Sequence, residues 1–367
     1  MEPSASAPSR DEILRAYFRE QARVCDEYGS PFTARLIESM WLDYEAGGPV
    51  AALIADWPGS PLADALTMRL CGALHAAALT GRDPALAAEY PEQRADYSLD
   101  AVWPLARALF ARERAWVTEF IRSPPQTNEV RRSIALLPGF LAFAQACPNG
   151  ELDTLEIGAS AGLNLGWDGF SYRTDSWSWG PDGGAPIDTE WHGPPPLLSI
   201  VPRIRARAAC DQNPLDINDR EQRLRLRSYV WADQHARLAR FDAAVELARA
   251  RAIPVERADA AEWLTRRLPQ RAPDRGTIVY HSLFLQYPPR ATRRAIAAAI
   301  EGAGARATPE APLAWLRLEP EGVLGGSRES PRFLVDMITW PGAVRRTLAY
   351  TDGHARAVQL LAPDSGA

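Results

Sequence analysis

Residues 155–165, LEIGASAGLNL, place small residues at regular spacing directly after an apolar run. Gly158, Ser160 and Gly162 fit the pattern G-x-S-x-G, which in α/β hydrolases carries a nucleophilic serine on a tight turn after a strand. The same residues fit a glycine-spaced loop that lets the backbone approach a nucleotide-like cofactor. Ser160 is therefore either a nucleophile or a small residue in a backbone-led binding loop.

A hydrolase elbow requires earlier strands that supply an oxyanion loop, and an Asp and a His that follow the serine. No strand is indicated before Leu152, and no HGGG-type motif is present. His281 and His354 are candidate bases with Asp259 as a partner, but His354 lies beside the turn signal Asp352-Gly353. The pattern favours the binding loop, and the hydrolase stays an alternative.

The acidic residue before the loop indicates which kind of cofactor it would accept. Glu156 precedes Gly158 by two residues and lies near the end of the expected strand. A carboxylate repels the pyrophosphate of a dinucleotide but favours the ammonium and sulfonium groups of S-adenosylmethionine. We therefore expect S-adenosylmethionine at residues 156–164, with contacts from Glu156, Gly158, Ala159, Ser160, Gly162 and Asn164.

The pattern along the chain predicts the elements that position this loop. Residues 1–10 are expected to be a disordered tail, and residues 11–148 a helical cap domain with apolar residues at helical spacing. Residues 149–367 alternate strand and helix patterns, which predicts a doubly wound α/β sheet with ligands at the strand C-termini. A Trp- and Gly-rich stretch at about 167–200 is expected to be an irregular insertion, whose tryptophans either pack under a long loop or cover the pocket and hold a cation. Residues 219–251 are expected to be a long helical region, and Asp352-Gly353 predicts a terminal antiparallel hairpin.

Composition excludes several classes of function. All 41 basic residues are Arg, so no Schiff-base lysine or phosphate-loop lysine exists. The formal net charge of -5 argues against a dominant nucleic-acid or membrane-surface role. The 4 cysteines are widely spaced, which disfavours a zinc site or a disulfide framework. We expect a cytoplasmic protein without a metal site or a membrane span, with a small molecule as its partner; the oligomeric state stays open.

A resemblance to known families follows from these motifs. EIGASAG resembles E/D-x-G-x-G-x-G, the first motif of class I S-adenosylmethionine-dependent methyltransferases, whose sheet also ends in an antiparallel hairpin. More closely, residues 126–139, 155–165, 210–248 and 279–289 resemble a bacterial family known as domain of unknown function 2332. The resemblance implies a Rossmann-like, methyltransferase-type domain. Ser160 departs from the middle glycine of the methyltransferase motif, and the insertion leaves the usual ribose-binding acid poorly placed.

The resemblance also implies roles for residues at later strand ends. Asp259 with Ala260 would contact the adenine amino group, although Asp259 equally fits a helix N-cap. His281 would face the reacting methyl group as a candidate general base, although a hydrogen-bonded histidine at a strand end is as good an interpretation. Glu319 ends the next strand and is a candidate substrate contact.

Further candidate substrate contacts lie in loops. Asp211 and Asp216 can bind ribose hydroxyls or substrate cations, or serve the turn around Asn213-Pro214. Tyr287 precedes two prolines and either lines a substrate pocket or belongs to an ordinary helix start. The polar cluster at a helix start, which fits either N-capping or substrate binding, comprises Gln126, Asn128 and Glu129.

Together these patterns predict methyl transfer from S-adenosylmethionine to a small-molecule acceptor bound between the helical cap and the sheet. Catalysis would rest mainly on positioning, with His281 as the candidate base. Two alternatives stay open: a serine hydrolase that uses Ser160, and a non-catalytic metabolite-binding protein on the same fold.

Overall fold

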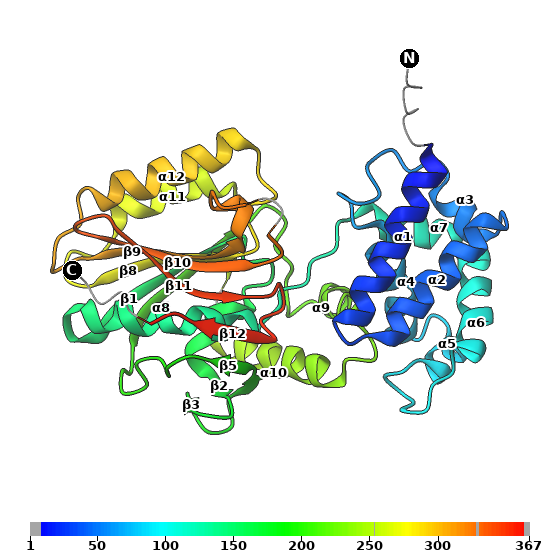
Figure 1. Ribbon diagram of the computed structural model, residues 1–367, viewed down its shortest axis with the longest axis horizontal. Coiled ribbons are helices and arrows are strands. Elements are labelled where there is room, and N and C mark those ends of the chain that lie inside the picture. Colours follow the sequence, from blue (N-terminus) through cyan, green and yellow to red (C-terminus); the bar gives the residue numbers. More distant parts are fainter. Residues whose placement is uncertain (1–8, 253, 328–329, 363–367) are drawn as a thin grey trace, which may run out of the picture. The chain divides into compact units, whose positions relative to one another are not determined.

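The computed structural model describes residues 9–252, 254–327 and 330–362 (Figure 1). The chain divides into two units, which are described separately. The helical unit comprises Met1–Thr127 and Asn218–Ala239, and the sheet unit comprises Asn128–Ile217 and Arg240–Ala367. This division differs from the predicted boundary at 148/149, because residues 128–148 belong with the sheet and residues 218–239 belong with the helices.

The helical unit is built from helices that share an apolar core. Its helices are α1 (Arg10–Glu27), α2 (Pro31–Glu45), α3 (Pro49–Ile54), α4 (Leu66–Leu79), α5 (Pro84–Glu89), α6 (Leu99–Arg112), α7 (Arg114–Arg122) and the later α9 (Arg220–Ser228). The predicted tail at 1–10 is wrong for its last two residues, because Ser9 caps α1 in a capping box with Glu12 and Arg10 begins the helix. Residues 1–8 lie outside the described part of the chain.

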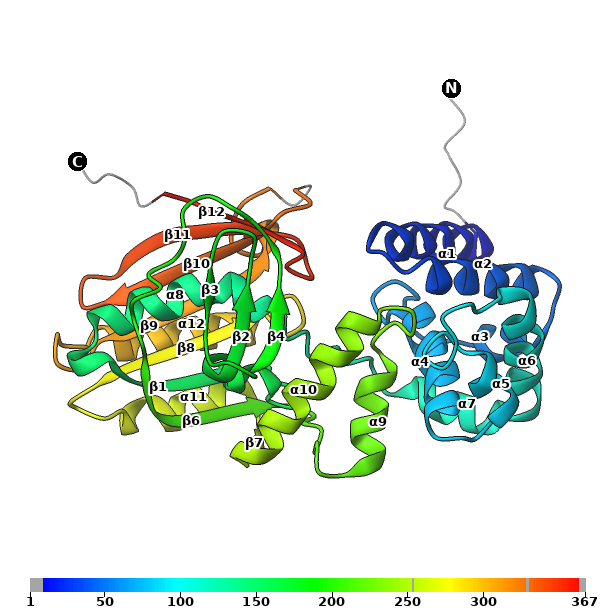
Figure 2. The same cartoon turned by 90° about the horizontal axis from the view of Figure 1, so that it is seen from below.

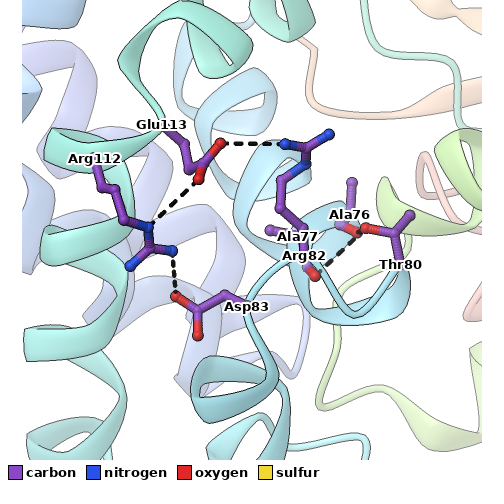
Figure 3. A network of polar contacts seen from close by, with 7 residues as sticks. All are labelled: Ala76, Ala77, Thr80, Arg82, Asp83, Arg112 and Glu113. Atoms are coloured by element: carbon purple, nitrogen blue, oxygen red, sulfur yellow. Dashed lines mark hydrogen bonds and ion pairs between the residues drawn. The ribbon is translucent and has the colours of Figure 1, made fainter.

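A network of charged side chains joins two turns of the helical unit (Figure 3). Asp83 caps α5 by accepting a hydrogen bond from the Leu86 N–H, and its other oxygen lies 3.0 Å from Arg112 Nη2. Glu113, at the junction of α6 and α7, lies 3.1 Å from Arg82 Nη1 and 3.4 Å from Arg112 Nε. The α4–α5 turn is thereby bonded to the α6–α7 junction.

Residues 218–239 belong to the helical unit because their polar side chains complete its helix ends. Asp233 accepts hydrogen bonds from the Ser30 hydroxyl and, at 3.0 Å, from the Phe32 N–H in the first turn of α2. Gln234 donates to the Tyr28 carbonyl at the end of α1 at 2.8 Å. The predicted long helical region is therefore two helices, α9 and α10 (His235–Arg251), separated by this capping segment.

The sheet unit contains a nine-stranded, mostly parallel sheet with the order β5-β12-β11-β10-β9-β8-β1-β6-β7. The parallel strands β7-β6-β1-β8-β9, numbered as they follow along the chain, have the order 3-2-1-4-5. The order reverses between β1 and β8, which is the topological switch point where ligands bind in open α/β sheets. The strands are β1 (Glu151–Ile157), β5 (Glu190–His192), β6 (Arg203–Asp211), β7 (Val255–Arg257), β8 (Gly276–Ser282), β9 (Leu313–Pro320), β10 (Phe333–Trp340), β11 (Val344–Thr351) and β12 (Ala357–Leu360).

Helices cover both faces of this sheet. On one face lie α11 (Ala260–Arg267) and α12 (Arg290–Gly304), whose apolar residues share a buried core with β1, β8 and β9. On the other face lies α8 (Arg132–Ala146), where Phe140 packs edge-on against Tyr280 of β8 at 5.0 Å between ring centroids. This packing explains why α8, predicted as part of the cap, belongs to the sheet unit.

The stretch predicted as an irregular insertion is more regular than expected. It forms η2 (Leu163–Gly169), a small sheet of β2 (Phe170–Arg173), β3 (Ser178–Trp179) and β4 (Ala185–Asp188), and the edge strand β5. Figure 2 shows the small sheet on the α8 side of the main sheet. Trp167 is fully buried and stacks on Phe140 at 4.0 Å, so its predicted packing role is confirmed. Short 3-10 helices also form at η1 (Pro148–Gly150), η3 (Leu268–Gln270) and η4 (Glu321–Val323).

The predicted end of the chain is confirmed. Strands β9, β10, β11 and β12 run antiparallel to one another in sequence, and β11 pairs with β12 across the turn that contains Asp352-Gly353. After Gly162 the chain forms the 3-10 helix η2, so the loop does not lead into the N-terminus of an α-helix.

Candidate functional site

The predicted binding loop follows β1 and has an unusual backbone. Gly158, Ser160 and Gly162 have φ values of +66°, +55° and +74°. A Cβ added at Gly158 would lie 2.2 Å from Phe284 Cδ2, and one at Gly162 would lie 2.8 Å from Val255 Cγ2, so both glycines are required by close packing. Ser160 adopts a left-handed conformation that non-glycine residues rarely have, and such outliers gather at functional sites.

Most backbone N–H groups of the loop are bonded within the protein. The Ala159 N–H donates to the Cys210 carbonyl at 3.1 Å, and the Gly162 N–H donates to the Ala159 carbonyl at 2.8 Å. The Leu163 N–H donates to Asn128 Oδ1 at 3.0 Å. These N–H groups are therefore not directed at a ligand, in contrast to a loop that cradles phosphate.

Asp211 holds the central residue of the loop from the neighbouring strand. It ends β6, and its Oδ2 accepts a hydrogen bond from the Ser160 N–H at 2.8 Å. Its Oδ1 accepts from the Asn213 N–H at 2.8 Å, so the predicted turn chemistry is confirmed, and the predicted contact with ribose hydroxyls or substrate cations stays a prediction. A carboxylate can accept about four hydrogen bonds, which leaves acceptor capacity for a ligand hydroxyl.

Glu156 is a buried carboxyl group directly before the loop. Its side chain is 3% exposed, and the described residues form no ion pair with it at 4.0 Å or less. The Tyr280 hydroxyl lies 3.3 Å from Glu156 Oε2 and 3.3 Å from the Asn164 carbonyl, so one proton is shared between two acceptors. Burial and, to a smaller extent, the nearby charge of Asp211 raise the pKa of Glu156 to about 8, against the hydrogen bond from Tyr280, which lowers it.

Asn164, close to Glu156 through the Tyr280 hydroxyl, carries an unsatisfied polar atom. Its side chain is buried, and its Oδ1 atom has no hydrogen-bond partner among the described residues. Buried amide oxygens are nearly always bonded, so this orphaned oxygen points to a missing donor. The Tyr280 hydroxyl, which lies 3.3 Å from both Glu156 Oε2 and the Asn164 carbonyl, links the two residues beneath the loop.

Asp259 and Ala260 lie at the start of α11, after β7. Asp259 Oδ1 accepts from the Ala261 N–H at 2.9 Å and the Glu262 N–H at 3.3 Å, so the N-cap interpretation is confirmed. Its Oδ2 lies 3.5 Å from Gln212 Nε2. Three adjacent strands thus end close to the predicted site. β1 leads into the loop, β6 ends at Asp211, and β7 is followed by Asp259.

His281 is placed differently from the prediction of a general base. It is fully buried, its Nδ1 lies 2.7 Å from Glu319 Oε1, and Trp315 Nε1 lies 3.2 Å from its Nε2. Because an indole N–H can only donate, Nε2 must accept and Nδ1 must carry the proton. Both ring nitrogens are occupied, so in this conformation the ring has no nitrogen that can take a proton from a substrate.

Glu319 holds the turn after β8 with its Oε1, while its Oε2 is buried without a hydrogen-bond partner among the described residues. Its Oε1 accepts from the Phe284 N–H at 2.8 Å and the Leu285 N–H at 3.0 Å, in addition to His281. The same turn contains Leu283 with φ +51°, a second non-glycine residue in the left-handed region. The ends of β1 and β8, on either side of the switch point, are thus both held in sparsely populated backbone conformations.

The remaining predicted substrate contacts are dispersed. Asn128 bonds the loop itself, since its Nδ2 donates to the Ala159 carbonyl at 2.9 Å. Glu129 is buried and accepts from the Arg131 N–H at 3.1 Å. Asp216 is exposed, and Tyr287 is 75% exposed. Gln126 belongs to the helical unit, so it is not assigned to the site.

Residues that sequence reasoning missed are Tyr280, Phe284 and Leu283. In the sequence, Tyr280 looks like an ordinary strand residue and Phe284 like an ordinary loop residue. Only the fold brings Tyr280 against Glu156 and Phe284 against Gly158. No side-chain type or spacing in the sequence signals these contacts.

None of the helices in residues 9–252, 254–327 and 330–362 is both long and apolar enough to cross a membrane. Within the same ranges, His, Cys, Asp and Glu side chains nowhere gather in groups of three that could hold a metal ion.

The fold and the site define an α/β protein with a mostly parallel sheet and a strained loop at its switch point. A family model described as an uncharacterized protein conserved in bacteria, DUF2332, matches residues 15–359, and the chain belongs to this family. No curated protein and no solved structure matches the chain.

Proposed function

We propose that the chain binds S-adenosylmethionine at residues 156–164 and transfers its methyl group to a small-molecule acceptor. The observation that carries the proposal is Glu156, a buried carboxyl group without a cationic partner among the described residues, beneath a loop most of whose N–H groups are already bonded. A buried carboxyl group without a partner is costly to keep. A cationic ligand would supply the missing partner.

The charge of the strand ends favours this cofactor over a dinucleotide. A pyrophosphate needs free N–H groups or basic side chains. Here the Ser160 N–H is bonded to a carboxylate, and acids stand at the ends of three adjacent strands, at Glu156, Asp211 and Asp259. S-adenosylmethionine carries an ammonium and a sulfonium group and no phosphate, so it suits an acidic set of residues.

Each acid then has a role that its position supports. Asp211 would accept hydrogen bonds from the ribose hydroxyls with the lone pairs that the Ser160 and Asn213 N–H groups leave. Asp259 would receive the adenine amino group with Oδ2, since Oδ1 caps α11. Glu156 with the orphaned Asn164 Oδ1 would face the cationic end of the ligand. The order 3-2-1-4-5 of the parallel strands places these ends beside the switch point, as in Rossmann-like methyltransferases.

The protein's part in the reaction would be orientation. S-adenosylmethionine, when bound, would supply an electrophilic methyl group to the acceptor. The loop and the three acids fix the donor in place, and positioning of this kind supplies much of the rate of such a transfer. Because both ring nitrogens of His281 already form hydrogen bonds, His281 has no role as a general base in this reaction.

Isothermal titration calorimetry with S-adenosylmethionine, NAD and the wild-type chain tests the proposal. We expect S-adenosylmethionine to bind and NAD not to bind. Glu156→Gln is expected to weaken S-adenosylmethionine binding, whereas Glu301→Gln on the exposed face of α12 is a control that should bind as wild type does. No binding of S-adenosylmethionine to the wild type at millimolar concentration would remove the proposal.

The left-handed Ser160 after β1 also keeps a serine hydrolase as a second candidate, because an elbow nucleophile stands on such a turn. His281 cannot serve as its base in this conformation. A fluorophosphonate probe decides: labelling of the wild type that is lost in Ser160→Ala would favour the hydrolase. Tight S-adenosylmethionine binding without turnover of any acceptor would instead indicate a non-catalytic binding protein.

A further inference from the structure

The binding loop is bonded across its width by one side chain. Asn128 Nδ2 donates to the Ala159 carbonyl at 2.9 Å, and Asn128 Oδ1 accepts from the Leu163 N–H at 3.0 Å. The amide therefore joins the two sides of the loop around Ser160. Asn128 has φ +26°, so the backbone that presents this amide is itself in a sparsely populated region.

A second segment bonds the centre of the loop. The Ser160 N–H donates to Asp211 Oδ2 at 2.8 Å, and the Ser160 carbonyl accepts from the Leu215 N–H at 3.4 Å. Every one of these contacts lies within the sheet unit. The loop is thus held by two segments that are distant from each other in the sequence.

Both segments adjoin places where the chain passes between the units. The helical unit ends at Thr127, and Asn128 is the next residue; the sheet unit is left again after Ile217, two residues beyond Leu215. We call residues 123–128 the first connection and residues 212–218 the second connection. Pro124 and Pro125 stiffen the first connection and Pro214 the second, because proline fixes its own φ and restricts the residue before it.

We propose that the loop at 158–163 anchors both connections, with Asn128 as the positioning residue, so that order in the loop and order in the connections are linked. Stiff, short segments transmit a constraint from their anchor, and here the anchor is the loop that would hold the ligand. Binding of S-adenosylmethionine would then also order the connections, and this last step alone rests on the proposed function.

Amide hydrogen–deuterium exchange of the full chain, followed by mass spectrometry, tests the proposal. Asn128→Gly removes the amide but tolerates a positive φ. Asn149→Gly is the matched control, because Asn149 is exposed, has φ +55° and lies before β1, at the opposite end of that strand. Asn128→Asp is a milder second variant that keeps one acceptor and loses the donor to Ala159.

Without ligand, we expect Asn128→Gly to speed exchange in 158–163 and in the first connection by about tenfold or more, since two hydrogen bonds are lost. Asn128→Asp should give a smaller change in the same segments, and Asn149→Gly none there. Exchange in Asn128→Gly equal to that in Asn149→Gly overturns the anchoring.

With S-adenosylmethionine, we expect slower exchange in the loop and both connections of the wild type, and in Asn128→Gly protection that does not extend to the first connection. Protection of the wild-type loop alone would overturn the linkage to the ligand. Failure of S-adenosylmethionine to bind the wild type would count against the proposed function and the ligand step, while the ligand-free comparison still decides whether Asn128 anchors the loop.

Discussion

Asp211 Oδ2 accepts the Ser160 N–H at 2.8 Å, so an acid at the end of β6 fixes the one non-glycine residue of the β1 loop that has a left-handed conformation. The hydrogen bond is charge-assisted, which makes it stronger than one between neutral groups. The loop is therefore shaped by side chains around it as well as by its glycines.

Asp211→Asn is expected to loosen the loop and weaken binding of S-adenosylmethionine by tenfold or more. Asn has one acceptor oxygen where Asp has two. Its amide nitrogen would therefore face either the Ser160 or the Asn213 N–H, and that N–H would lose its acceptor. The loss of one such bond is worth about 1–3 kcal/mol. Calorimetric titration measures the affinity, with Asp182→Asn in an exposed turn as control. Wild-type affinity in Asp211→Asn would show that the acid does not support the ligand site.

Glu156 predicts how stability changes with pH. Its pKa is raised to about 8 in the folded chain from 4.5, so between these values the folded state holds a proton that the unfolded state has lost. Unfolding then releases a proton, and stability falls as pH rises, by on the order of 3 kcal/mol between pH 4.5 and 7. Glu156→Gln should lack this slope and be more stable than wild type at pH 8.

Urea unfolding of wild type, Glu156→Gln and the exposed control Glu301→Gln at several pH values measures the effect. The difference between wild type and Glu156→Gln isolates the contribution of this carboxyl group, because the other titrating groups are common to both. A constant difference from pH 5 to 8 would mean that Glu156 is ionised throughout.

The same group predicts that affinity for a cationic ligand rises with pH. A bound ammonium or sulfonium group favours the ionised carboxylate, so binding should release a proton while Glu156 is still protonated. We expect S-adenosylmethionine to bind more tightly at pH 8 than at pH 6 in the wild type, but with little change in Glu156→Gln. Titrations in buffers of different ionisation enthalpy count the protons released. Equal pH dependence of the affinity in both proteins would mean that Glu156 does not interact with the ligand.

Much of the sheet unit could be predicted because its signals are local. The apolar run before Gly158 and the turn at Asp352-Gly353 are read from neighbouring residues, and the strands form where these patterns place them. The assignment of residues 218–239 to the helical unit could not be predicted. It depends on Asp233 and Gln234 reaching helix ends about 200 residues earlier in the chain.

For the candidate site, the sequence predicts the backbone of the loop better than the side-chain contacts around it. Positive φ at Gly158 and Gly162 follows from residue type and spacing. The environment of His281 cannot be predicted from residue type and spacing, because a histidine can serve as a base or as a buried hydrogen-bond donor. Only the positions of Trp315 and Glu319 on the adjacent strand, β9, decide between these roles.

His281→Ala is expected to lower the free energy of unfolding by about 2–4 kcal/mol. The change removes the donor to Glu319 and the acceptor for the Trp315 N–H in a fully buried region, and it leaves a cavity. Urea unfolding provides the measurement, and His192→Ala, an exposed histidine on β5, is the control that should change little. A stable His281→Ala variant with lost turnover would instead return this residue to the role of a base.

Asp83 and Arg112 in the helical unit form one ion pair, but their loss is expected to have unequal effects. Asp83→Ala removes the N-cap of α5 and should cost about 1–2 kcal/mol, because the Leu86 N–H loses its acceptor. Arg112→Ala removes a half-exposed partner of Asp83 and Glu113, and exposed ion pairs contribute at most about 1 kcal/mol. Urea unfolding of the two variants of the full chain compares them. A larger loss from Arg112→Ala than from Asp83→Ala would mean that the network in Figure 3, rather than the cap, stabilises this turn.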